Sequence, residues 1–152
     1  MKIVYCCYAG AHSSVIAGHL HLKQLPWKHA PSIKEILALP EFDRREQKDR
    51  GIPYFLGRDE RGHEVYLLGL EKNYSLGLQA IYYILNEYSN PQEWKFFNTL
   101  PEINITTRIG GYLSRKLHFV VVGRYIAAWG IQKCFPRLLR LVKKVKELNQ
   151  IG

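Results

Sequence analysis

The chain has 152 residues, of which 47% are hydrophobic and 23% are charged, and a formal net charge of +9. This composition is typical of a globular protein with a substantial core, and no apolar run approaches the ~20 residues that a membrane-spanning helix requires. Since Met1-Lys2 leads directly into an apolar segment, we expect no signal peptide, a cytoplasmic location and a single α/β domain over residues 1–152.

The first 22 residues predict a strand, a loop and a helix. Residues 2–8 form an apolar run, residues 7–14 (Cys-Tyr-Ala-Gly-Ala-His-Ser-Ser) are mostly small or polar, and apolar periodicity follows from about residue 14 to 22. A strand, a Gly/Ser loop and a helix N-terminus together bind phosphate, because N–H groups and the positive end of the helix dipole converge there. The sequence therefore predicts an anion site in the 7–14 loop.

The rest of the chain alternates between strands and helices. In chain order we expect a short helix after Pro31 with Ser32 as N-cap, an exposed charged connection at 43–50, strands at 52–56 and 64–70, a helix at 75–88, a strand at 94–100, a helix capped by Asn104 and a last helix from about Pro136 to 148. Periodicity does not decide whether 119–129 is a buried strand or a helix. This order predicts an α/β three-layer sandwich with a partly parallel sheet and one antiparallel hairpin.

Cys7 is a candidate nucleophile. Neighbouring Cys6 and Cys7 point to opposite faces of a strand, so one should be core and the other could face the loop. A helix dipole lowers the pKa of a thiol placed at its N-terminus. The loop resembles the phosphocysteine loop of phosphotransferase-system IIB proteins and, more distantly, that of low-molecular-weight tyrosine phosphatases, which carry an Arg where this loop has His12. The alternative is a small buried residue at a strand end.

His12 is the second candidate catalytic residue. It precedes a pair of serines, in something like the position of the Lys of a Walker A loop, and can donate to phosphate or pass a proton. Equally, His12 can have a structural role and form a hydrogen bond with the loop backbone. The candidate phosphate ligands of the same loop are Gly10, Ala11, Ser13 and Ser14. His19 and His21 diverge on a helix and the cysteines lack zinc spacing, so we expect no metal site.

A second candidate cluster follows the strand expected at 94–100. Its members are Asn98, Asn104, Arg108, Gly110, Gly111, Ser114 and Arg115, and Arg124 is a further candidate. Arg108 and Arg115 share a helical face and could clamp an anion, while a charge at Arg124, inside an apolar stretch, needs a partner or a ligand. Alternatively, the arginines lie on the surface and the two glycines only allow close packing of the helix. Asp43 and Asp59 are candidate acids, although Asp59 also fits a hairpin turn.

Motifs along the chain resemble a family known as domain of unknown function 3189, found mainly in spore-forming Firmicutes. They are Tyr-Ala-Gly-Ala-His-Ser-Ser at 8–14, Gly-x-Asp-x-x-Gly at 57–62, Arg-Ile-Gly-Gly-Tyr-Leu-Ser-Arg at 108–115, Gly-Arg at 123–124 and Trp-Gly at 129–130. The family commonly has Gly-Gly-Thr-His-Ser at 9–13 and no fixed Cys7, which favours His12, Ser13 and Ser14. The resemblance implies no established activity.

We therefore expect a protein that binds a phosphorylated small molecule or nucleotide in the 7–14 loop, with phosphoryl-transfer or hydrolase chemistry if it is an enzyme. A nucleic-acid-binding module is the first alternative, and a non-catalytic interaction protein of sporulation is the second. The basic residues for the first alternative are Lys133, Arg137, Arg140, Lys143, Lys144 and Lys146. The same residues also fit the solvated face of an amphipathic helix. The cofactor and the oligomeric state stay open.

Overall fold

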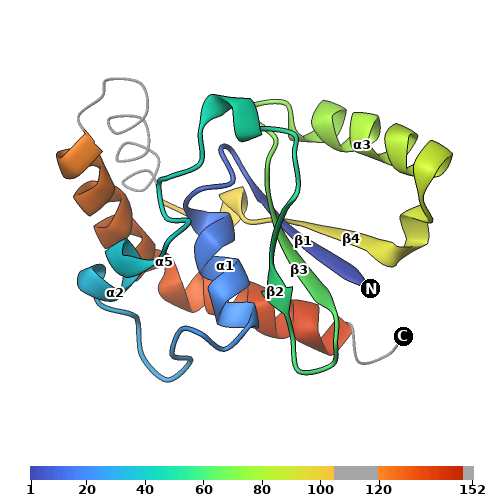
Figure 1. Ribbon diagram of the computed structural model, residues 1–152. Helices are drawn as coiled ribbons and strands as arrows, with labels where there is room; N and C mark the ends of the chain where they lie inside the picture. Colours follow the sequence, from blue (N-terminus) through green and yellow to red (C-terminus); the bar gives the residue numbers. More distant parts are fainter. Residues whose placement is uncertain (105–119, 149–152) are drawn as a thin grey trace.

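The computed structural model describes residues 1–104 and 120–148 (Figure 1). Its strands and α-helices are β1 (Lys2–Cys7), α1 (Ser13–His21), α2 (Ile33–Ala38), β2 (Tyr54–Arg58), β3 (Glu64–Gly69), α3 (Tyr74–Tyr88), β4 (Trp94–Asn98) and α5 (Val120–Leu148). Short 3-10 turns lie at Gln47–Asp49, Pro91–Glu93 and Leu100–Glu102. The predicted strands and helices of the first 100 residues are confirmed to within a few residues at each end.

The sheet has the order β2-β3-β1-β4. β1 runs parallel to β3 and to β4, and β2 pairs with β3 in an antiparallel hairpin, as the sequence predicts. The register places Cys7 opposite Gly69, and Cys6 opposite Asn98. The carboxyl ends of three strands therefore meet at one edge of the sheet, where α/β proteins bind their ligands.

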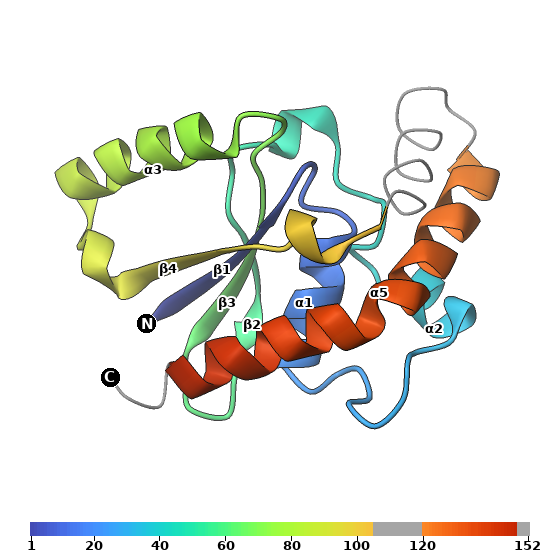
Figure 2. The same ribbon diagram turned by 180° about the vertical axis from the view of Figure 1, so that it is seen from behind.

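Helices cover both faces of this sheet (Figures 1 and 2). Side chains alternate along β1, so Ile3 and Tyr5 join the core beneath α1 and α5, while Val4 and Cys6 face α3. The larger core includes Val15, Ile16 and Leu20 of α1 and Ile131, Leu138 and Val142 of α5. This arrangement confirms the α/β class with a layer of helices on each side.

The expected start of the last helix at Pro136 is wrong. α5 begins at Val120 and passes through Pro136, so the described part of the ambiguous 119–129 stretch is helical. Proline removes one hydrogen bond from a helix interior, but buried Ile131 and Leu138 flank it and pack with α1. Tertiary packing thus keeps α5 continuous, although Pro136 alone predicts a helix boundary there. No helix among the described residues is both long and apolar enough to cross a membrane.

Two predicted local signals are confirmed with defined contacts. Ser32 caps α2, because its hydroxyl accepts from the Glu35 N–H while the Glu35 carboxylate accepts from the Ser32 N–H. Asp59 is a turn residue of the β2–β3 hairpin, and its Oδ1 accepts from the N–H groups of Arg61 and His63. These hydrogen bonds fix the start of α2 and the turn of the hairpin, as the local sequence predicts.

A buried chain of polar groups joins α1 to the hairpin. The Tyr5 hydroxyl lies 2.8 Å from His21 Nδ1, and His21 Nε2 lies 3.1 Å from Asp59 Oδ2. Burial lowers the pKa of His21 despite the carboxylate beside it. His19 points elsewhere and pairs with Glu41 at 2.9 Å. The two histidines therefore diverge, as the helical spacing indicates.

We expect Gly69→Ala to destabilise the fold and to move the 7–14 loop. The added Cβ would lie 2.7 Å from the carbonyl carbon of Ala9 and 3.0 Å from the amide nitrogen of Gly10, both of them backbone atoms. Overpacking of this kind costs about 1–3 kcal/mol, measurable by urea unfolding. Gly62→Ala is the control, because its Cβ would enter open space and only the left-handed backbone (φ +80°) opposes it. A smaller loss for Gly69→Ala than for Gly62→Ala would contradict this expectation.

Candidate functional site

The 7–14 loop begins where β1 ends and leads into α1. Gly10 takes the left-handed conformation (φ +68°), and a Cβ there would lie 2.9 Å from the Gly69 nitrogen. The loop is bonded to the segment after β3, since the Leu70 N–H donates to the Cys7 carbonyl and the Glu71 N–H to the Tyr8 carbonyl. Two glycines thus allow the loop backbone to lie directly against the end of β3.

The Cys7 sulfur lies inside the curve of this loop. The Gly10 N–H donates to Sγ at 3.1 Å, and the Ser14 Oγ lies 3.2 Å from Sγ. Burial raises the pKa of the Cys7 thiol, but hydrogen bonding from the Ser14 hydroxyl and from the backbone at His12, Ser14 and Ala11 outweighs burial, so the pKa lies below its ordinary value. The side chain is 3% exposed. Cys6 points the other way, and burial raises its pKa.

His12 forms a pair with Asp43. His12 Nε2 lies 2.8 Å from Asp43 Oδ1, and the Asp43 N–H donates to the Ala11 carbonyl at 2.9 Å. Asp43 has a left-handed backbone (φ +58°), a conformation that non-glycine residues adopt at a cost and that clusters at functional sites. The candidate acid and the candidate histidine therefore lie together, 31 positions apart in the sequence.

The two serines of the loop have different surroundings. Ser14 faces the Cys7 sulfur, whereas Ser13 is fully buried and its hydroxyl lies 2.8 Å from Thr99 Oγ1. Thr99 in turn donates to the Cys6 carbonyl at 2.9 Å. Ser13 therefore ties the start of α1 to the end of β4. Sequence reasoning missed Thr99, whose only signal is its position directly after the carboxyl end of a strand.

Arg45 is the main residue that sequence reasoning missed. The 43–50 connection is not wholly exposed as expected, because Arg45 is only 8% exposed. Its guanidinium donates to the carbonyls of Asp49 and Ile52 at 2.9 and 3.1 Å and lies over the Tyr54 ring, which explains how a charge is buried there. Its Nε lies 3.3 Å from the Cβ position of Gly10. A cation therefore reaches the 7–14 loop from outside it.

Arg50 is a second cation beside the loop. Its guanidinium lies 5.3 Å from the centre of the Tyr8 ring and pairs with Glu71. The 43–50 connection thus brings Arg45 and Arg50 to the 7–14 loop. The sequence pattern alone had indicated that both arginines are solvated.

The predicted second cluster is only partly described. Arg124 of α5 donates to the carbonyls of Leu37 and Phe42 at 3.4 and 3.5 Å, next to Asp43 in the chain. The Asn104 N–H donates to Cys134 Sγ of α5 at 3.1 Å. Arg108, Gly110, Gly111 and Arg115 lie outside the described residues. A clamp formed by Arg108 and Arg115 therefore stays a prediction.

The 7–14 loop brings together hydrogen-bond donors, a thiol and a histidine. Within residues 1–104 and 120–148, no three His, Cys, Asp or Glu side chains come together as metal ligands. The loop offers N–H donors, a hydroxyl, a thiol whose pKa is lowered and a histidine–carboxylate pair at one helix N-terminus. Such groups can bind an anion, attack an electrophile or transfer a proton.

The fold and this loop define an α/β protein whose residues of interest gather where β1 passes into α1. The family described as "Protein of unknown function (DUF3189)" matches residues 2–147, nearly the whole chain, and the protein belongs to this family. The family resemblance seen in the motifs is thereby confirmed. No curated protein and no solved structure matches the chain.

We expect Cys7 to ionise at a lower pH than an ordinary cysteine, because the loop hydrogen bonds stabilise its thiolate. The measurement is the ultraviolet thiolate absorbance as a function of pH, taken as the difference between the wild-type protein and Cys7→Ser. Ser14→Ala should raise the midpoint, since it removes the hydroxyl 3.2 Å from Sγ. A midpoint equal to that of free cysteine, unchanged in Ser14→Ala, would contradict this interpretation.

Proposed function

We propose that the 7–14 loop binds the phosphate group of a phosphorylated small molecule or nucleotide, and that Cys7 accepts the phosphoryl group during hydrolysis. The observation that carries the proposal is the convergence of the Gly10 N–H and the Ser14 hydroxyl on the Cys7 sulfur, beside the His12–Asp43 pair. A loop that stabilises a thiolate can also stabilise a phosphate dianion, because both need N–H donors and a positive helix end.

The cation that a phosphate site needs is supplied from outside the loop in this proposal. Arg45 approaches Gly10 at its Nε and is fixed by two backbone carbonyls, so its charge is already placed before a ligand binds. A fixed guanidinium stabilises phosphoryl oxygens well. Arg45 therefore takes the role that an arginine inside the loop has in the low-molecular-weight tyrosine phosphatases.

The reaction has two steps. The Cys7 thiolate attacks phosphorus, the S–P bond forms, the ester P–O bond breaks, and the leaving oxygen takes a proton from protonated His12. Water then attacks phosphorus and returns a proton to His12, while the S–P bond breaks and releases inorganic phosphate and the thiolate. Asp43 holds the imidazole through Nε2, and Nδ1 makes no hydrogen bond within the described residues, so Nδ1 faces no competing partner there.

The proposal is preferred to nucleic-acid binding by the basic helix. Leu138, Val142 and Val145 of α5 are buried in the core, and Lys143 lies over the Trp27 ring. Lys146 pairs with Glu60. These contacts fit the solvated face of an amphipathic helix. A cytoplasmic location, where phosphorylated metabolites are plentiful, is part of the proposal.

The test is hydrolysis of para-nitrophenyl phosphate by the purified full chain. Cys7→Ser should abolish phosphate release, and His12→Ala should slow it about 100-fold or more, because general acid catalysis is lost. His63→Gln is the matched control, since His63 also pairs with an aspartate, Asp59, but in the hairpin turn at the other end of the sheet. It should leave the rate unchanged.

Binding is measured in parallel by the thermal shift that inorganic phosphate produces. Cys7→Ser should retain the shift, since the loop N–H groups remain, and this also shows that the variant folds. Absence of a thermal shift in the wild-type protein would contradict the proposed phosphate site. Hydrolysis that persists in Cys7→Ser would contradict the proposal that Cys7 is the nucleophile.

A further inference from the structure

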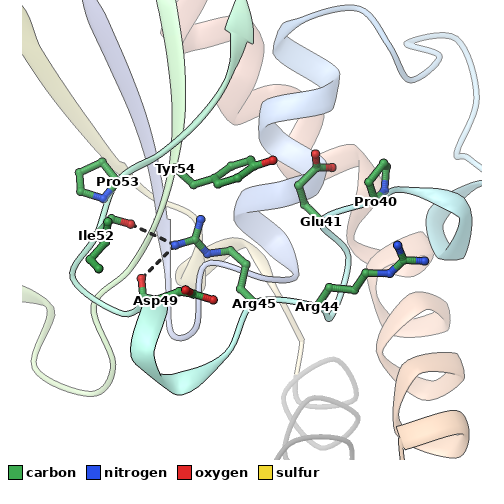
Figure 3. Close-up of a pocket in the computed structure, with 8 residues that line it drawn as sticks. All are labelled: Pro40, Glu41, Arg44, Arg45, Asp49, Ile52, Pro53 and Tyr54. Atoms are coloured by element: carbon green, nitrogen blue, oxygen red, sulfur yellow. Dashed lines mark hydrogen bonds between the residues drawn. The ribbon is translucent and has the colours of Figure 1, made fainter.

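A cavity of about 320 Å³ lies between the segment that follows α2 and the segment that leads into β2 (Figure 3). Its walls include Arg44, Arg45, Glu41, Asp49 and Tyr54, together with two prolines. A volume of this size falls at the lower end of the range for small-molecule sites. The 7–14 loop chemistry does not use this space.

The cavity and the 7–14 loop share a wall. Arg45 lines the cavity, and the same side chain brings its Nε to 3.3 Å from the Cβ position of Gly10. Asp43, two positions earlier in the chain, pairs with His12 of the loop. A molecule with its phosphate in the loop can therefore extend along Arg45 into the cavity.

The cavity walls combine flat apolar faces with hydrogen-bond acceptors. Tyr54 is 44% exposed and lies beside Pro53, whereas Pro40 lies beyond Glu41 on the other side of the cavity (Figure 3). Glu41 accepts from His19 through Oε2, and Asp49 accepts from the Glu46 N–H through Oδ2. The other oxygen of each carboxylate is not used in these contacts. Such walls suit an aromatic ring that carries N–H and O–H donors, because the ring can stack and the donors can reach the carboxylates.

A guanidinium at the rim strengthens the preference for an anionic ligand. Arg44 is exposed, and its side chain makes no hydrogen bond or ion pair within the described residues. Arginine binds phosphate oxygens and also stacks on aromatic rings. A ligand with a heteroaromatic ring, hydroxyl groups and a phosphate satisfies all of these groups together.

We propose that the cavity receives the nucleoside part of a nucleoside monophosphate whose phosphate is held by the 7–14 loop. This inference rests on the proposed function, which it deepens by naming the class of substrate. The base stacks against Tyr54, the sugar and base donors reach Glu41 and Asp49, and Arg45 lies between the nucleoside and the phosphate.

The test is titration calorimetry of the full chain with inorganic phosphate, ribose 5-phosphate, adenosine and the four common ribonucleoside monophosphates. At least one monophosphate should bind about tenfold or more tightly than ribose 5-phosphate, which is the gain expected from base stacking on an aromatic side chain. Tyr54→Ala should remove this gain and weaken the binding of inorganic phosphate far less, because Arg45 loses its contact with the ring but keeps its hydrogen bonds to the carbonyls of Asp49 and Ile52. Phe55→Ala is the matched control, because Phe55 is the next residue of β2, is similarly exposed at 48%, and packs on Tyr66 instead.

The outcomes separate the two proposals. Equal affinities for all phosphate compounds, unaffected by Tyr54→Ala, would overturn the nucleoside inference and leave the phosphate site standing. No binding of inorganic phosphate or of any phosphate compound would overturn both. Adenosine that binds as tightly as its monophosphate would overturn the shared site, because the loop would then contribute nothing.

Discussion

The close approach of the 7–14 loop to the end of β3 is the constraint on which the rest of the candidate site depends. Gly10 and Gly69 touch through backbone atoms, and no side chain at either position would allow this contact. At this contact the Gly10 N–H points inward and donates to the Cys7 sulfur at 3.1 Å. The hydrogen bonds that lower the pKa of the Cys7 thiol thus depend on how the loop backbone packs, and they include those from His12 and Ser14.

The segment between α2 and β2 contributes the remaining residues of the candidate site. Asp43 holds the loop through its N–H and its carboxylate, and Arg45 places a buried cation beside Gly10. In our proposal this segment supplies the charge for the phosphate, the orientation of the proton donor and the walls of a nucleoside pocket. One connection of charged residues therefore links phosphate binding, proton transfer and ligand selection.

Local sequence patterns predicted much of this structure, but they did not predict the contacts between residues that are distant in the sequence. The strand, loop and helix of the first 22 residues, the Ser32 cap and the β2–β3 hairpin depend on neighbouring residues, and all are confirmed. The course of α5 through Pro136, the burial of Arg45 and the bond from Ser13 to Thr99 depend on tertiary packing. Sequence patterns treat a charged residue such as Arg45 as solvated. They do not show that its guanidinium is buried, where it donates to two backbone carbonyls and packs on the Tyr54 ring.

The measurement that tests the central claim most directly is a crystal structure of the protein with orthovanadate, which mimics a phosphoryl group under attack. We expect vanadium bonded to Cys7 Sγ, with vanadate oxygens accepting from the N–H groups of the 7–14 loop and one oxygen near Arg45. Vanadate bound elsewhere, with the Cys7 sulfur still enclosed by the loop and unmodified, would contradict a phosphate site in this loop.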